Sequence, residues 1–136
     1  MSDQPAFQLS NPATISAPAG YSHLATVSSG RLVIISGQVA LDVNGNVVGK
    51  DDFRAQARQV FENLRAAVES AGGSFRDIIK LNTYVVDFAG MSHFRNVRDE
   101  YVDTAHPPAS TAVQVQRLFR PEFLLEVEAI AVVKAR

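Results

Sequence analysis

The run Leu124-Leu125-Glu126-Val127-Glu128-Ala129-Ile130-Ala131-Val132-Val133 decides the fold. Successive side chains of a strand point to opposite faces, so Glu126 and Glu128 share one face. The other face is apolar and carries Leu125, Val127, Ala129, Ala131 and Val133. A pair of carboxylates on so apolar a strand is costly unless it meets a partner, a cleft or another subunit. The run therefore predicts a strand with one buried face and a contact or binding site on the other.

Upstream of this strand, residues 51–71 change to helical spacing. Their apolar side chains fall on one helical face: Phe53, Ala57, Val60, Phe61, Leu64, Val68 and Ala71. Asp51 or Asp52 can cap the start, and Gly72-Gly73 can end the helix. An amphipathic helix of this kind is expected to pack on a sheet.

Two hairpins are predicted before the helix. The runs 23–27 and 31–36 are rich in β-forming residues and are separated by Ser28-Ser29-Gly30, which predicts that they pair with each other. The runs 41–43 and 47–48 are joined through Asn44-Gly45, a strong turn dipeptide.

The remaining elements give an α+β fold. Residues 78–86 are predicted to form a central strand with both faces largely apolar, and residues 87–103 a second helix, which His106-Pro107-Pro108 stops. The order is two hairpins, helix, strand, helix and two strands, so we expect a mixed β-sheet with two helices packed on one face. The uncovered face still holds apolar residues, which favours an oligomer.

Length and composition exclude several classes of function. The 136 residues fit one domain, expected over 17–136, and the proline-containing segment 1–16 reads as an extended N-terminal arm. The net charge of −1 provides no field to attract nucleic acid or a membrane. There is no cysteine, the three histidines lack ligand spacing, and no nucleotide-binding motif occurs, so neither metal nor cofactor is expected. Residues 1–7 do not read as a signal peptide, and a cytoplasmic protein is expected.

The chain resembles the RidA/YjgF family of small trimeric proteins from Ala17 to Lys134. The matching motifs are Gly20-Tyr21-Ser22, Ser36-Gly37-Gln38-Val39, Gln56, Asn63-Leu64, Ala71-Gly72 and Leu125-Glu126-Val127-Glu128-Ala129-Ile130-Ala131. The resemblance implies a chorismate mutase-like fold. It also implies a homotrimer whose sheets close around a central barrel, with a small-molecule ligand bound at the subunit interface.

The same resemblance implies catalytic roles for Glu126 and Tyr21. The first glutamate of the Glu-x-Glu strand faces the cleft and holds a water near the imine carbon, and the tyrosine donates a hydrogen bond or covers the ligand. Ser36, Gly37 and Ala112 match positions that contact the ligand. The alternatives are an arginine partner for Glu126 across the trimer contact, an interface role for Tyr21, and a simple bulge at Gly37. For Glu128 a structural ion pair is expected.

One position departs from the family pattern. Where imine-hydrolysing members have an arginine that grips the substrate carboxylate, this chain has Ser110. A hydroxyl cannot replace the two parallel charge-assisted hydrogen bonds of a guanidinium. Arg98, Arg117 and Arg120 are the candidates to substitute for it, against the alternative that each is a solvated or interface arginine.

Two functions are consistent with these residues. The first is a trimeric hydrolase of imines or enamines whose substrate is neutral or carries its acid group elsewhere. The second is a non-catalytic trimer that binds a small molecule or a partner. Ser110 favours the second function or a changed substrate, whereas Tyr21 and Glu126 favour the first.

Overall fold

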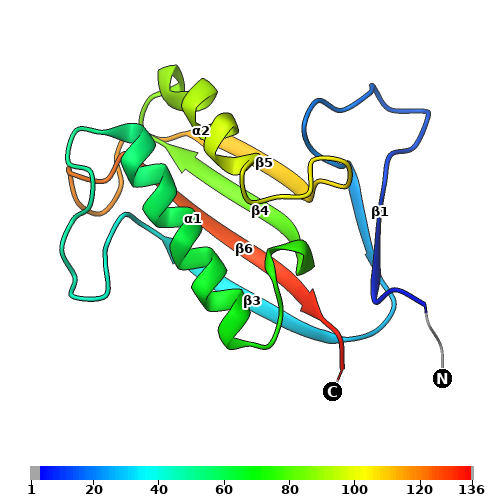
Figure 1. Ribbon diagram of the computed structural model, residues 1–136. Helices are drawn as coiled ribbons and strands as arrows, with labels where there is room; N and C mark the ends of the chain where they lie inside the picture. The colour runs from blue at the N-terminus through cyan, green and yellow to red at the C-terminus, as the bar shows by residue number, and fades with distance from the viewer. Residues whose placement is uncertain (1–3, 136) are drawn as a thin grey trace.

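A computed structural model describes residues 4–135 (Figure 1). Its elements in chain order are β1 (Phe7–Ser10), β2 (Leu24–Val27), β3 (Arg31–Gln38), α1 (Phe53–Ser70), the 3-10 helix η1 (Phe75–Asp77), β4 (Ile78–Val85), the 3-10 helix η2 (Phe88–Gly90), α2 (Met91–Arg98), β5 (Ala109–Gln114) and β6 (Leu125–Val133).

The main sheet has four strands in the order β3-β6-β4-β5. Strand β6 is antiparallel to both of its neighbours, and β4 and β5 are parallel, joined by a crossover through α2. Both helices lie on one face of this sheet (Figure 1). The predicted α+β fold with two helices and a mixed sheet is confirmed.

Helix α1 follows the sequence pattern closely. The Asp52 side chain caps its start by accepting a hydrogen bond from Ala55 N at 3.1 Å, and Gly72 (φ +89°) follows its end. Its buried face includes the polar residue Gln56, which is fully enclosed. Gln56 Nε2 donates to the Gly49 and Glu122 carbonyls at 3.1 and 2.8 Å, and its Oε1 accepts from Leu124 N at 2.9 Å. This clamp fixes the segment that leads into β6.

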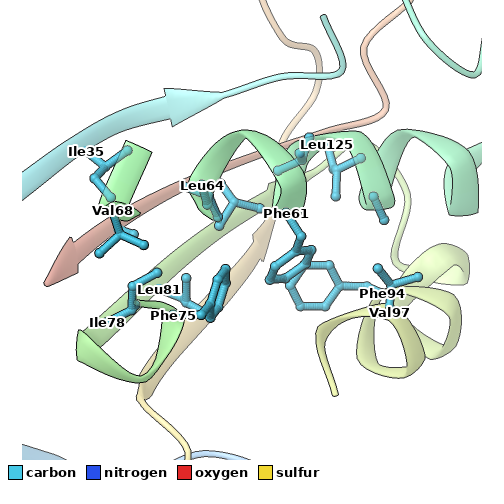
Figure 2. Packing of buried hydrophobic residues seen from close by; sticks show 14 of the residues in the cluster. Ile35, Phe61, Leu64, Val68, Phe75, Ile78, Leu81, Phe94, Val97 and Leu125 are labelled. Atoms are coloured by element: carbon cyan, nitrogen blue, oxygen red, sulfur yellow. The ribbon is translucent and has the colours of Figure 1, made fainter. Parts of the chain in front are cut away.

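Phe61 is at the centre of the core between helices and sheet (Figure 2). It is fully buried, and its ring centroid lies 5.2 Å from that of Tyr101, 5.6 Å from Phe94 and 5.8 Å from Phe75. Burial of such a side chain contributes about 1.5–3 kcal/mol before entropy, and aromatic contacts add to it. One residue of α1 therefore joins α2, η1 and the segment after α2.

The first predicted hairpin is wrong, whereas the second is confirmed. Strand β2 pairs with β1 in a separate two-stranded sheet, and β3 pairs with β6. A turn at Gly30 (φ +97°) reverses the chain but does not fix which strands pair, because β6 offers β3 a longer apolar partner. The turn at Asn44-Gly45 forms as expected, with a single antiparallel bridge between Leu41 and Val47.

The open face of the sheet is less uniform than predicted. In β4 the side chains that alternate with the buried ones are Lys80, Asn82 and Tyr84, so the expectation that both faces are apolar is wrong for this strand. In β3, however, Leu32 and Ile34 are 62% and 74% exposed. The open face thus has an apolar half on β3 and a polar half on β4.

Within residues 4–135, no helix combines the length and apolar character that a membrane span requires.

Replacing Phe61 by alanine should lower the free energy of unfolding by about 3–5 kcal/mol, because a cavity would form where the three neighbouring rings meet. Urea denaturation followed by circular dichroism measures this loss. Val43→Ala is the control, since Val43 is 98% exposed and its truncation should change stability by less than about 0.5 kcal/mol. Equal effects of the two substitutions would contradict this account of the core.

Candidate functional site

Glu126 lies on the open face of the sheet, opposite Tyr84 of β4, as the alternation of β6 predicted. It forms no ion pair or side-chain hydrogen bond with any residue in the described range 4–135. Partial burial, with a smaller contribution from the charge of Glu128, raises the pKa of the Glu126 carboxyl. The result is a carboxylate that is more basic than usual and has no hydrogen-bond donor among residues 4–135.

Glu128 has a different environment two residues further along β6. Its Oε1 accepts hydrogen bonds from Tyr84 Oη at 2.9 Å and Asn82 Nδ2 at 3.2 Å. The hydrogen bond to Glu128 in turn raises the pKa of the Tyr84 hydroxyl. Among the described residues the partners of Glu128 are therefore neutral donors rather than the expected cation.

Gly37 provides the space for the Glu126 side chain. The register of β3 against β6 shifts between Ile35 and Gln38, so Gly37 lies in a β-bulge. A Cβ added to Gly37 would come within 2.8 Å of Glu126 Cδ and 2.9 Å of Glu126 Cγ. Gly37 therefore both forms a bulge and permits close approach, and the group that approaches it in this chain is the Glu126 carboxylate.

Asn63 holds the chain just after the bulge. Its Nδ2 donates to the carbonyls of Val39 and Leu41 at 3.1 and 3.0 Å, while its Oδ1 accepts from Gln59 Nε2 at 2.8 Å. These bonds tie the exit of β3 to α1 and keep the Ser36-Gly37 segment in place beside Glu126.

Ser110 and Ala112 lie on the other edge of the sheet. They are paired with Leu81 and Thr83 of β4, whose side chains are buried beneath the helices, so they point to the helix side. The spacing of about 4.8 Å between strands puts β3 and β5 about 14 Å apart. One chain thus brings Ser36, Gly37 and Glu126 together, and separates them from Ser110 and Ala112.

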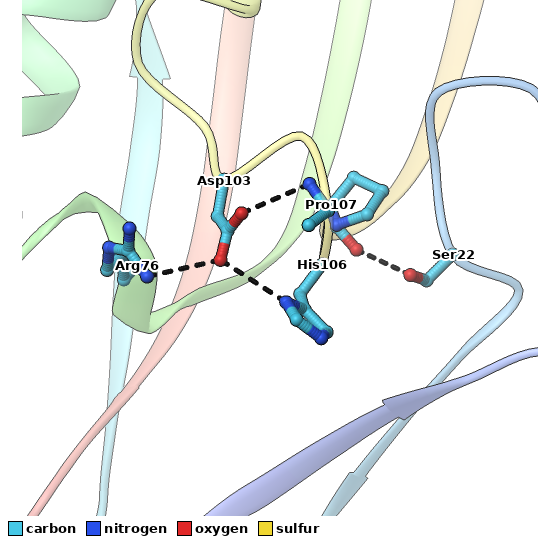
Figure 3. A network of polar contacts seen from close by, with 6 residues as sticks. Ser22, Arg76, Asp103, His106 and Pro107 are labelled. Carbon is cyan, nitrogen blue, oxygen red and sulfur yellow. Dashed lines mark hydrogen bonds and ion pairs between the residues drawn. The ribbon is translucent and has the colours of Figure 1, made fainter.

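Tyr21 is held near the start of β5. Its neighbour Ser22 donates from the backbone to the Pro108 carbonyl at 3.1 Å and from Oγ to the Pro107 carbonyl (Figure 3). The Tyr21 ring meets the His23 ring edge-on, with centroids 5.3 Å apart. Tyr21 therefore belongs to the same edge of the sheet as Ser110.

A polar network fixes the loop that leads into β5. One oxygen of Asp103 contacts Arg76 Nη1 at 3.1 Å and His106 Nδ1 at 3.4 Å, and the other accepts from Ala105 N (Figure 3). The Ala105 bond, followed by the contacts with His106 and Arg76, lowers the pKa of Asp103. The charged carboxylate thus ties the loop to η1, just ahead of the Pro107 carbonyl that Ser22 binds.

The three arginines proposed to replace the missing cation each have contacts within the chain. Arg98 is buried, pairs through Nε with Asp99 Oδ1 at 3.0 Å, and packs against Gly20. Arg120 pairs with Glu122 at 3.3 Å and lies over the Phe123 ring. Arg117 Nε donates to the Leu118 carbonyl at 3.4 Å.

The sequence interpretation missed Arg95. This exposed residue of α2 lines a cavity of about 460 Å³, which also includes Phe88, Ala89, Met91, Ser92 and Ala112. A clue was available in the sequence, because Arg95 follows the core residue Met91 by four positions and so shares its helix face.

Among residues 4–135 the side chains form no group of three metal-ligating residues.

Comparisons with known proteins match most of this chain to one family. The model of the family described as Endoribonuclease L-PSP matches residues 12–133. A Salmonella typhimurium protein named 2-iminobutanoate/2-iminopropanoate deaminase is 39% identical over 126 residues, covering 88% of this chain and 94% of that protein. A RutC family protein of Pyrococcus horikoshii is 37% identical over 105 residues, covering 77% of this chain and 82% of that protein.

Solved structures of Rid proteins have the same fold as this chain. A Rid family protein of unknown function from Yersinia pestis superposes with a TM-score of 0.85 at 36% identity, covering 95% of this chain and all of that one. RidA from a Psychrobacter species superposes with a TM-score of 0.70 at 32% identity, covering 96% of this chain and all of that one. The chain belongs to the RidA/YjgF family. This RidA/YjgF protein has the strand segment Glu126-Val127-Glu128 and a serine at position 110.

Replacing Glu126 by glutamine should stabilise the protein at neutral pH. The native pKa of Glu126 is raised, so ionisation costs native stability as the pH rises through that pKa, and the cost disappears below the unfolded value of about 4.3. The stability gain of the variant should therefore be largest near neutral pH and vanish in acid. Urea denaturation across this pH range measures it.

Glu122→Gln is the matched control for this experiment. The pKa of Glu122 is lowered, first by a backbone hydrogen bond and then by Arg120. Its charge therefore contributes stability above the unfolded pKa, which is lost as the pH falls through the native pKa. The two variants should shift neutral-pH stability in opposite directions, and a shift of the same sign would contradict the environment described for Glu126.

Proposed function

We propose that this RidA/YjgF protein is a homotrimer that binds small imine- or enamine-type metabolites in clefts between subunits, and that Glu126 supports their hydrolysis. The observation that carries the proposal is the separation of the two groups of residues. Gly37 and Glu126 lie at the β3 side of the sheet, and Ser110 and Ala112 lie on β5. A cleft that uses both groups needs the β3 side of one chain beside the β5 edge of another.

The chemistry of imine hydrolysis suits an unpartnered basic carboxylate. Water adds its oxygen to the carbon of the C=N bond while a proton reaches the nitrogen. The C–N bond of that adduct then breaks, giving a carbonyl compound and ammonia. In the proposed mechanism Glu126 accepts the proton of the attacking water and returns it to the departing nitrogen. Its raised pKa makes it a stronger base than an ordinary glutamate.

The second candidate is a non-catalytic trimer that binds a small molecule or a partner in the same cleft. Ser110 favours it, because a ligand carboxylate loses a guanidinium partner there.

RNA is a weaker candidate ligand, despite the name of the matching family model. The chain has 13 basic and 14 acidic residues, and Glu126 and Glu128 would repel phosphates. A cytoplasmic location fits the small-metabolite proposal.

The protein should sediment as a species of about three times its 14.7 kDa chain mass, because the exposed side chains of Leu32 and Ile34 need cover. Analytical ultracentrifugation at micromolar concentration tests this. Ile34→Lys should shift the protein towards monomer, since it would bury a charge, whereas Val43→Lys on the exposed hairpin should not. A stable wild-type monomer would reject both the trimer and the shared cleft.

Exchanging Ser110 for arginine should raise activity on imino acids made from serine or threonine, on which the wild-type protein should be very slow. The new guanidinium would fix the substrate acid, worth on the order of 2–5 kcal/mol, so kcat/KM should rise at least tenfold. A coupled assay in which a dehydratase generates the imine measures ammonia release.

The gain should disappear in the double variant Ser110→Arg/Glu126→Gln, which keeps the cation but lacks the proton acceptor. Wild-type activity equal to that of the arginine variant would show that another group already binds the acid. A trimeric Ser110→Arg protein that neither hydrolyses an imino acid nor binds a carboxylate would favour the non-catalytic function.

A further inference from the structure

Arg95 is a cation on the helix side of the β5 edge. The cavity of about 460 Å³ that it lines includes Ala112 of β5 and the apolar side chains of Phe88, Ala89 and Met91. Cavities of a few hundred Å³ with apolar walls and few polar groups are typical of small-molecule sites. Here the arginine provides the charge and the three apolar residues provide the wall.

The Arg95 guanidinium is available to a ligand. Within residues 4–135 it forms no ion pair and no side-chain hydrogen bond, unlike Arg98, Arg117 and Arg120. The neighbouring carboxylate at the end of α2, that of the C-cap residue Asp99, is already bound by Arg98 Nε at 3.0 Å. Arg95 therefore has an unused planar fork of donors, which is the geometry that binds a carboxylate with two hydrogen bonds.

Arg95 is also close to the position that lacks the expected cation. Ser110 and Ala112 are two residues apart on one strand and point to the same side, so they are separated by about 7 Å. Arg98, less than one turn further along α2, packs against Gly20, and Ser22 bridges Ala109 at the start of β5. Helix α2 thus follows the β5 edge, with Arg98 near Ala109 and Arg95 near Ala112.

We infer that Arg95 supplies the positive charge of the ligand-binding cleft, shifted along β5 from Ser110 to Ala112. This inference rests on the proposed function. It implies a ligand whose carboxylate is displaced from Ser110 by one two-residue repeat of β5, and we take this displacement to lengthen the distance between the carboxylate and the reacting carbon relative to a 2-imino acid. The substrate class is then an imine or enamine that carries its acid group two or more carbons away from the C=N carbon.

Two stable carbonyl compounds test this inference by calorimetric titration. 2-Oxobutanoate carries its carboxylate next to the carbonyl carbon, and 4-oxopentanoate carries it two methylene groups away. The wild-type trimer should bind 4-oxopentanoate more tightly than 2-oxobutanoate. Arg95→Gln should weaken 4-oxopentanoate binding by about tenfold or more, because it removes a charged hydrogen-bond donor pair.

Arg54→Gln is the matched control. Arg54 is an exposed arginine of α1 whose contact is with His93 at 3.5 Å, so its removal changes the net charge equally without touching the cavity. Arg54→Gln should bind 4-oxopentanoate like the wild type. Ser110→Arg should reverse the preference towards 2-oxobutanoate.

Three results would overturn the assignment of Arg95: no binding of 4-oxopentanoate by the wild type, equal binding by Arg95→Gln, or an equal loss in Arg54→Gln. The proposed function is judged separately, by sedimentation and by Glu126-dependent hydrolysis of a neutral imine. A trimer that hydrolyses the neutral imine but binds no carboxylate keeps the proposed function and rejects the role of Arg95.

Discussion

The pairing of β6 between β3 and β4 is the interaction on which the rest of the molecule depends. It places Leu125, Val127 and Ala129 against α1 and leaves Glu126 and Glu128 on the open face. The Gln56 clamp fixes where β6 begins, and thereby which residues face the core, since a one-residue slip would exchange the two faces. The same hydrogen bonds that build the sheet therefore determine the position of the candidate catalytic carboxylate.

Much of this fold could be predicted because the relevant signals are local. The helical period and the Asp52 cap define α1, alternation defines β6, and Asn44-Gly45 defines its turn. The pairing of β2 with β3 was predicted wrongly because the choice of strand partner is not local. A turn at Gly30 is compatible with strands that pair elsewhere, and here β1 and β6 take up the hydrogen bonds.

The candidate site could be predicted only in part, for the same reason. Alternation along β6 was enough to predict which face of the sheet carries Glu126. Its contact with Gly37 could not be predicted in this way, because it depends on a bulge that shifts the register of β3 against β6. The position of Arg95 beside Ala112 depends on how α2 lies along β5, and no pattern within the sequence of α2 specifies that placement. Residue type and spacing could indicate which side chains are unusual, but the partners of those side chains depend on strand order and helix placement.

The two glutamates of β6 show how neighbouring positions acquire different chemistry. Tyr84 and Asn82 donate hydrogen bonds to Glu128, and the charge of Glu128, together with the larger effect of burial, opposes ionisation of Glu126. Glu126 has no donor of its own among the described residues, and Gly37 allows its carboxylate to lie against the backbone of β3. A chain that covered the open face with apolar side chains would remove water from Glu126 and raise its pKa further, whereas an arginine placed against Glu126 would lower it. Covering the apolar residues of β3 and changing the basicity of Glu126 would therefore be linked consequences of a single contact on this face.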